Sequence, residues 1–89
     1  MRSRTTRRFR EAFRELPREI QEQTRQAYAR FRDNPSHRSL RFKKVQVRGN
    51  VHSARITKDY RALGTVEGDE VVWFWVGSHE DYERLVKKL

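Results

Sequence analysis

The stretch that most constrains this chain is Val71–Val76, six consecutive apolar residues between the polar segment Glu67–Glu70 and Gly77. Neighbouring residues of a strand point to opposite faces, so a run without alternation is covered on both faces. A helix of six residues would scarcely survive nucleation, and β-branched and aromatic residues favour strands. The run therefore predicts an interior strand of a sheet, with layers packed on each side. Its carboxyl end, which leads into Ser78 and His79, is where we look for chemistry.

The first third of the chain has the pattern of two amphipathic helices. Apolar residues recur at helical spacing in two stripes, the first made of Phe9, Ala12, Phe13 and Leu16, the second of Ile20, Thr24, Ala27, Tyr28 and Phe31. Thr5 or Thr6 is placed to cap the first helix. Pro17 is placed as the first residue of the second helix, which Asn34-Pro35 ends. We expect a helical hairpin that needs a sheet to cover its apolar stripes.

The rest of the chain reads as strands followed by a short helix. Residues 35–50 predict a loop running into a short, irregular strand, and a turn separates the strands Val51–Thr57 and Tyr60–Val66. Ser78 is placed to cap a terminal helix with a stripe of Tyr82, Leu85, Val86 and Leu89. The predicted fold class is α+β, a single domain over residues 1–89 with a helical hairpin on a three- or four-stranded antiparallel sheet. A further strand can form in residues 2–5.

Positive charge is concentrated in the first half of the chain. Residues 1–50 carry 15 Lys and Arg against 5 Asp and Glu, a net charge of +10, and residues 51–89 carry 6 against 7, a net charge of −1. Arginine outnumbers lysine 16 to 5, and the guanidinium is suited to bidentate contacts with phosphate. A surface of this kind favours a phosphate backbone or an acidic protein as partner.

Several classes of protein are not expected. Cysteine is absent, so no disulfide or thiolate zinc site is expected. No secretory signal or membrane span is expected either, because the longest apolar run is far too short. We expect a soluble, cytoplasmic protein.

Three segments in this order resemble the RelE/ParE superfamily of type II toxins. They are Ser53-Ala54-Arg55-Ile56, Asp59-Tyr60-Arg61-Ala62-Leu63-Gly64 and the strand ending Val76-Gly77-Ser78-His79-Glu80-Asp81-Tyr82. The glycine–hydroxyl–histidine ending is similar to the RelE-like, specifically YafQ-like, branch. The resemblance implies a RelE-like fold, cleavage of messenger RNA on the ribosome without a metal or other cofactor, and silencing by a cognate antitoxin. RelE itself relies on lysines in the strand where this chain has Ser53 and Arg55, so its lysine chemistry is not carried over.

Metal-free RNA cleavage needs a base for the ribose 2′-hydroxyl and cations for the charge that builds up on the phosphate. We predict His79 as the acid–base group and Arg61 as the phosphate clamp, with Arg55 and Tyr82 as further catalytic candidates. Each has an alternative: His79 as a first-turn residue that packs or faces water, Arg61 as the partner of an acid such as Asp59 or Asp81, Arg55 as a solvated arginine. Tyr82 is as well suited to packing in the core or against an antitoxin as to stacking on the substrate.

A second group of basic residues is predicted to contact mRNA or ribosomal RNA: His37, Arg41, Lys43, Lys44 and His52. A solvated basic loop is the alternative. No paired histidines or convergent carboxylates predict a metal site. Trp73 and Trp75 are read as core residues rather than as stacking platforms for bases.

Three functions therefore remain open at this point. A ribosome-dependent endoribonuclease toxin leads, with the ribosome, mRNA and a cognate antitoxin as partners and no membrane partner. A ParE-type inhibitor of DNA gyrase of the same fold is the alternative; His79 after the glycine favours the nuclease over it, since poisoning gyrase requires no general base. The charge also permits a catalytically inactive nucleic-acid-binding domain.

Overall fold

The computed structural model describes all 89 residues, and its sheet is built around the predicted apolar strand. That strand, β5 (Glu70–Ser78), lies between β1 (Arg2–Thr5) and β4 (Tyr60–Glu67). Beyond β4 follow β3 (Val51–Thr57) and the edge strand β2 (Lys43–Gln46), so the order in the sheet is β1-β5-β4-β3-β2. Short 3-10 turns at Arg38–Leu40 and Arg48–Asn50 flank β2. The interior position predicted for the apolar run is confirmed.

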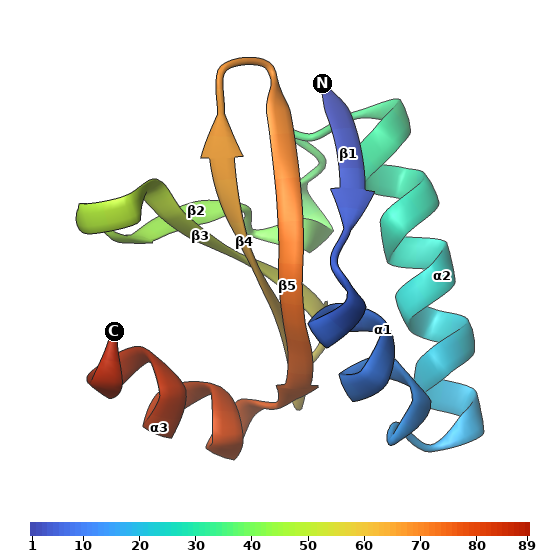
Figure 1. Ribbon diagram of the computed structural model, residues 1–89. Coiled ribbons are helices and arrows are strands. Elements are labelled where there is room, and N and C mark those ends of the chain that lie inside the picture. Colours follow the sequence, from blue (N-terminus) through green and yellow to red (C-terminus); the bar gives the residue numbers. More distant parts are fainter.

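The helices cover the two faces of the sheet unequally. Helices α1 (Arg7–Arg14) and α2 (Arg18–Asp33) form the predicted hairpin on one side, and α3 (His79–Lys88) lies on the other (Figure 1). The predicted α+β architecture is confirmed. The sheet has five strands instead of the predicted three or four, because residues 2–5 do form a strand, and it is mixed, because β1 runs parallel to β5.

Local capping follows the sequence closely. The Thr6 hydroxyl accepts the backbone N–H of Phe9 at the start of α1, and the Ser78 hydroxyl accepts that of Asp81 at the start of α3. Each bond satisfies a backbone donor that has no partner within its helix. Pro17 differs from the prediction by one position: it is the cap residue before α2 and not the first helical residue.

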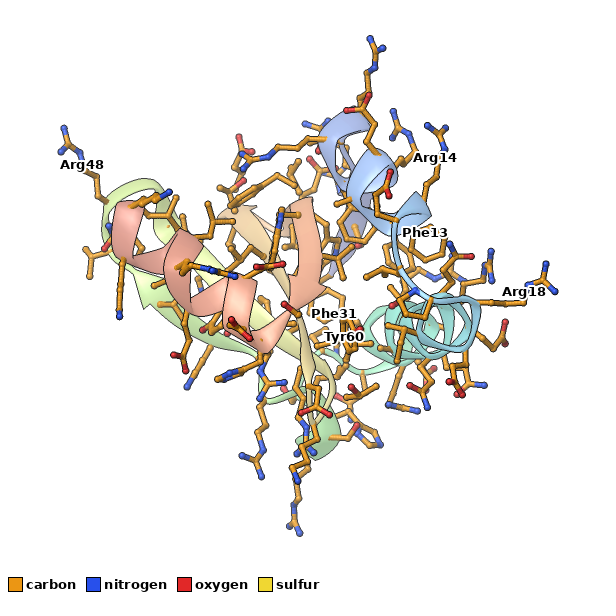
Figure 2. The ribbon with its side chains drawn as sticks, turned by 90° about the horizontal axis from the view of Figure 1, so that it is seen from below. Phe13, Arg14, Arg18, Phe31, Arg48 and Tyr60 are labelled. Carbon is orange, nitrogen blue, oxygen red and sulfur yellow. The ribbon has the colours of Figure 1, made fainter.

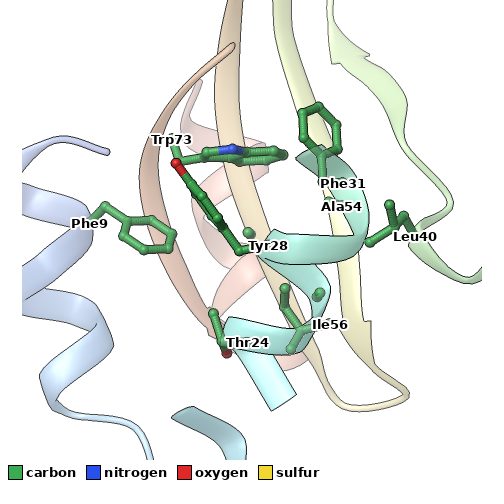
Figure 3. A pocket seen from close by; sticks show the side chains of 10 residues that line it. Phe9, Thr24, Tyr28, Phe31, Leu40, Ala54, Ile56 and Trp73 are labelled. Atoms are coloured by element: carbon green, nitrogen blue, oxygen red, sulfur yellow. The ribbon is translucent and has the colours of Figure 1, made fainter. Parts of the chain in front are cut away.

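The core fills the space between the helical hairpin and the sheet. Phe31 of α2 lies edge-on to Phe42 and Trp73, with ring centroids 5.0 and 5.2 Å apart, and is only 2% exposed. The Trp73 indole N–H donates to the Ser3 hydroxyl at 2.8 Å, which ties β1 to the core. Figure 3 shows Phe31 and Trp73 beside a cavity, which has a volume of ≈ 20 Å³ and a lining that is apolar apart from Thr24.

The two tryptophans of β5 lie on opposite faces because the strand contains a bulge. Trp73 pairs with Gly64 and Trp75 with Leu63, so Phe74 is an extra residue between the two pairs. A bulge of this kind reverses the side to which later residues point. The reading of both tryptophans as core residues therefore holds for Trp73, which is 3% exposed, whereas Trp75 is half-buried on the face of α3.

Candidate functional site

The candidate site forms where β3, β4 and β5 end beside the start of α3. Arg55 of β3 pairs with Arg61 of β4, and Arg61 pairs in turn with Gly77 of β5. Directly paired residues of neighbouring strands share a face, so Arg55 and Arg61 project on the side of α3. His79 follows two residues after Gly77, and its backbone N–H donates to the Asp59 carbonyl at 2.7 Å. Residues far apart in the sequence thus converge on one corner of the sheet.

Arg61 is the most constrained side chain of this corner. Its Nη1 donates to three backbone carbonyls of the turn before β4, those of Thr57, Lys58 and Tyr60, at 2.6, 3.2 and 2.9 Å. The sequence-based alternative, an ion pair between Arg61 and Asp59 or Asp81, does not form, and the Asp81 carboxylate pairs with Arg84 instead. Arg61 is therefore held by backbone oxygens rather than by a counter-charge.

Positive charge accumulates around Arg61. Burial lowers the pKa of the Arg61 guanidinium, and the charges of Arg55 and Arg41 lower it further, against opposite contributions from Tyr82 and Asp59. None of these three arginines forms an ion pair within the chain. Because a guanidinium keeps its proton, Arg55 and Arg41 each repel Arg61 as long as no anion lies between them. We call Arg41, Arg55 and Arg61 the arginine cluster.

His79 and Tyr82 lie beside the arginine cluster in the first turn of α3. Their rings are 5.6 Å apart between centroids and tilted by 42°. Nδ1 of His79 lies 3.4 Å from a carboxylate oxygen of Glu83, one helical turn further on, and the His79 side chain is 41% exposed. A contact at Nδ1 leaves Nε2 as the ring nitrogen available to a ligand.

The residues predicted to contact RNA do not all lie on this face. Lys43 pairs with Ser53, which shares the face of α3, whereas Lys44 pairs with His52 on the face of the helical hairpin. The His52 ring stacks on Phe42 at 4.9 Å and its Nδ1 lies 3.1 Å from the Asn50 carbonyl oxygen.

His37 occupies a different environment again. It caps the 3-10 turn at Arg38–Leu40, where its Nδ1 accepts the backbone N–H of Ser39 at 3.2 Å. The structure thus brings together His79, Tyr82, Arg61, Arg55 and Arg41, with Lys43 on the same face. It leaves His37, Lys44 and His52 outside this group.

Sequence reasoning missed two features of the corner. Glu83 was not singled out, although its spacing of four residues from His79 places both on one side of a helix. The carbonyls that hold Arg61 carried no signal, because any residue type supplies a backbone carbonyl. No group of three or more His, Asp and Glu side chains is arranged to hold a metal ion. No helix is both long and apolar enough to cross a membrane.

Comparison with known families identifies the class of protein. The model of the ParE-like toxin domain matches residues 18–84, most of the chain. The chain therefore belongs to the ParE-like toxin family, and its predicted place in the RelE/ParE superfamily of toxins is confirmed. No curated protein sequence matches it.

Solved toxin structures share its fold. The RelB–RelE antitoxin–toxin complex of Methanococcus jannaschii gives a TM-score of 0.73 at 17% identity, covering 91% of this chain and 95% of that chain. YafQ of E. coli strain BL21(DE3) gives a TM-score of 0.72 at 9% identity, covering 92% and 98%. The toxin–antitoxin complex RelBE2 of Mycobacterium tuberculosis gives a TM-score of 0.61 at 23% identity, covering 88% and 96%. At these identities the likeness establishes a RelE-like fold.

Proposed function

We propose that this toxin is a metal-independent, ribosome-dependent mRNA endoribonuclease that stops translation. The observation that carries the proposal is the geometry of the corner: His79, with the Tyr82 ring beside it, bonds the turn that holds Arg61, and Arg61 pairs with Arg55, whose charge repels it. A phosphodiester between them relieves their repulsion, and an imidazole beside that phosphodiester supplies acid–base chemistry. The fold shared with RelE and YafQ supports the assignment to this branch.

The chemistry follows from the groups at the corner. Nε2 of His79 accepts the proton of a ribose 2′-hydroxyl, whose oxygen attacks the adjacent phosphorus. The bond from phosphorus to the 5′-oxygen breaks, that oxygen takes a proton from water, and the hydroxide that remains takes up the proton from His79. The products are a 2′,3′-cyclic phosphate and a 5′-hydroxyl. Arg61 and Arg55 stabilise the additional negative charge on the phosphate oxygens, and Tyr82 stacks on a neighbouring base.

RNA contacts extend beyond the reacting phosphate. Lys43 continues the positive surface along the face of α3, and Arg41 lies near enough to Arg61 to act on its charge; both contact mRNA in this proposal. His37, Lys44 and His52 lie elsewhere and contact RNA outside the catalytic corner. At the connection of α1 and α2, Arg14 and Arg18 point away from the protein, as does Arg48 on the far side (Figure 2). These exposed guanidinium groups suit ribosomal RNA, whose contacts weaken as salt rises.

A cognate antitoxin is the second proposed partner. The RelE-like structures from Methanococcus jannaschii and Mycobacterium tuberculosis are both complexes of a toxin with its antitoxin. An acidic segment of such a protein would neutralise the arginine cluster and exclude RNA from it. Both partners place the activity in the cytoplasm.

Inhibition of DNA gyrase remains a second candidate, because the matching family description names ParE. In that function the positive surface would bind a protein or DNA, and His79 would have no chemical role. A nucleic-acid-binding domain without activity is the third reading. The three differ in what the purified toxin does to RNA and to gyrase.

The test measures single-turnover mRNA cleavage on programmed ribosomes, with gyrase supercoiling in parallel. Wild-type toxin is expected to cut mRNA and to leave supercoiling unchanged. His79→Ala should slow cleavage by about 10²–10⁴-fold and Arg61→Ala by about 10²–10³-fold, the usual losses for a general acid–base group and for a preorganised charge donor.

Arg2→Ala is the matched control. Arg2 pairs with Asp69 at the end of β5 remote from His79, and its substitution should leave the rate unchanged. Wild-type cleavage by both His79→Ala and Arg61→Ala would place the site elsewhere. Loss of supercoiling without cleavage would favour the gyrase inhibitor. If the toxin neither cuts mRNA nor inhibits supercoiling, the inactive nucleic-acid-binding domain is the reading that remains.

A further inference from the structure

The turn between β3 and β4 directs its backbone carbonyls at the candidate site. Three carbonyls, of Thr57, Lys58 and Tyr60, accept hydrogen bonds from the single Nη1 of Arg61 at distances of 2.6 to 3.2 Å. The bond to Tyr60, at 2.9 Å, lies within the usual range for a charged N–H donor, and the bond to Thr57, at 2.6 Å, is shorter still. The guanidinium is thus fixed to the turn through one of its two terminal nitrogens.

The remaining carbonyl of the turn holds the other half of the site. The Asp59 carbonyl accepts the backbone N–H of His79 at 2.7 Å, so it fixes the first residue of α3. This N–H belongs to a helix start and has no acceptor within α3. One four-residue turn, Thr57–Tyr60, therefore holds both Arg61 and His79, which are 18 positions apart in the sequence.

The conformation of the turn depends on one side chain. The Thr57 hydroxyl accepts the backbone N–H of Asp59 at 3.2 Å. A threonine that bonds the backbone two residues on stabilises a local turn. The same contact orients the Lys58–Asp59 peptide, whose Lys58 carbonyl is an acceptor for Arg61, and it fixes the start of the next peptide, whose Asp59 carbonyl is the acceptor for His79.

The planar guanidinium allows Arg61 to bind the carbonyls of the turn and an anion at the same time. Arginine has five N–H donors in a fixed plane, and with Nη1 bound to the turn, Nε and Nη2 remain for an anion. A lysine ammonium is a single point of charge and cannot bridge the turn and a phosphate in this way. Arg61 is therefore a positioned donor and not merely a positive charge.

We propose that the Thr57–Tyr60 turn is a positioning element that fixes Arg61 and His79 relative to one another, with Thr57 as its positioning residue. This inference rests on the proposed nuclease function, since it names what aligns the two catalytic groups. Thr57 touches neither RNA nor the reacting atoms. Its effect passes through the Lys58–Asp59 peptide to Arg61, and through the backbone of Asp59 to the carbonyl that holds His79.

Two substitutions of Thr57 separate positioning from folding. Thr57→Val keeps the shape and the β-branched side chain but loses the acceptor, whereas Thr57→Ser keeps the hydroxyl. We expect Thr57→Val to lower kcat by roughly 10- to 100-fold with KM unchanged, since a small misplacement of catalytic groups has an effect of this size. Thr57→Ser should restore most of the rate. The same samples are measured by amide hydrogen exchange, where the His79 amide should exchange faster in Thr57→Val alone.

A third variant tests whether Arg61 needs the several N–H donors of its guanidinium or only its positive charge. Arg61→Lys retains the charge and should nevertheless cut as slowly as Arg61→Ala, at unchanged Tm. Cleavage by Arg61→Lys at the wild-type rate would overturn the account of Arg61 as a positioned donor.

The outcomes for Thr57 also distinguish this inference from the proposed function. If wild-type toxin does not cut mRNA on ribosomes, the proposed function fails. If it cuts and Thr57→Val cuts equally fast, only the positioning role is overturned. A slower Thr57→Val with an unchanged exchange rate at His79 would overturn the route through Asp59. A fall in rate explained entirely by a smaller folded fraction would reduce Thr57 to a structural role.

Discussion

The two faces of the sheet are built in opposite ways. Toward α1 and α2 the face is closed and apolar, and Phe31, Val71 and Val76 are each at most 2% exposed. Toward α3 it is partly open: Leu63 of the sheet is buried there, but the helix has no buried residue, and Leu89, which caps its end, is 42% exposed. The arginine cluster lies on this second face.

This division shows how so small a chain tolerates concentrated positive charge. Repulsion among the arginines destabilises the compact state, and α3 buries too little to offset it. The apolar face supplies most of the favourable burial, since free energy scales with the apolar area removed from water. One face therefore maintains the fold, and the other is left free to bind an anion. The following predictions test this separation.

The largest effect on folding is expected on the apolar face. Phe31→Ala removes a ring that contacts both Phe42 and Trp73 and should reduce the free energy of unfolding by about 3–5 kcal/mol. Leu89→Ala, at the C-cap of α3, is the control and should change it by less than about 0.5 kcal/mol. Urea unfolding of both variants provides the measurement. Similar losses in both would mean that the two faces share the stability.

The sequence was enough to predict most of the apolar face. The unbroken run Val71–Val76 located the interior strand, and the helical stripes through Phe9 and Phe31 located the layer above it. The sequence predicted less about which strands pair with one another. Residues 2–5 permitted a strand, but their parallel partner lies about 70 positions away, and no local pattern specifies such a contact.

The candidate site was predictable in part. The order of Arg61, Gly77 and His79 indicated the corner, because antiparallel strands joined by a short loop bring these positions together. The division of Lys43 from Lys44 and His52 depended on the register of the short strand β2, which polar residues specify weakly. The bulge at Phe74 and the carbonyls that hold Arg61 arise from backbone geometry, which side-chain patterns do not encode.

Substituting two glycines of the sheet, one on each face, compares how tightly the two faces are packed. A Cβ at Gly64 would lie 2.8 Å from the Trp73 ring and 3.0 Å from the Val72 carbonyl oxygen, on the apolar face. A Cβ at Gly77 would lie 2.5 Å from the outer edge of the Trp75 ring, on the face of α3. Gly64→Ala should cost about 3 kcal/mol, since the backbone cannot move aside, and Gly77→Ala about 1 kcal/mol, since Trp75 is half-buried and can turn away.

Thermal and urea unfolding measure both variants, and Trp fluorescence reports the movement of Trp75 in Gly77→Ala. A larger loss for Gly77→Ala than for Gly64→Ala would mean that the face of α3 is the more tightly packed one.

Removing a helix cap on each face should separate global from local stability. Thr6→Ala and Ser78→Ala each remove one hydroxyl acceptor, a loss of about 1 kcal/mol. For Thr6 the loss should appear in the global unfolding free energy, because α1 carries buried Phe9. For Ser78 it should appear as faster amide exchange within α3 alone, since that helix buries no residue. Equal changes in global stability would show that α3 unfolds together with the core.

The smallest effect is expected for the pair His79–Glu83. The two side chains are 41% and 59% exposed and 3.4 Å apart, so solvent and salt screen their attraction. Glu83→Gln keeps the size of the side chain and removes its charge, and should change the free energy of unfolding by less than about 0.5 kcal/mol. Urea unfolding at low and at high salt measures this, with Glu22→Gln, from the exposed Glu22–Arg25 pair on α2, as the control. A decrease in the free energy of unfolding above about 2 kcal/mol that persists at high salt would mean that His79 lies in a water-excluded environment. The contrast between a closed and an open face would then be wrong at the residue where the chemistry is proposed.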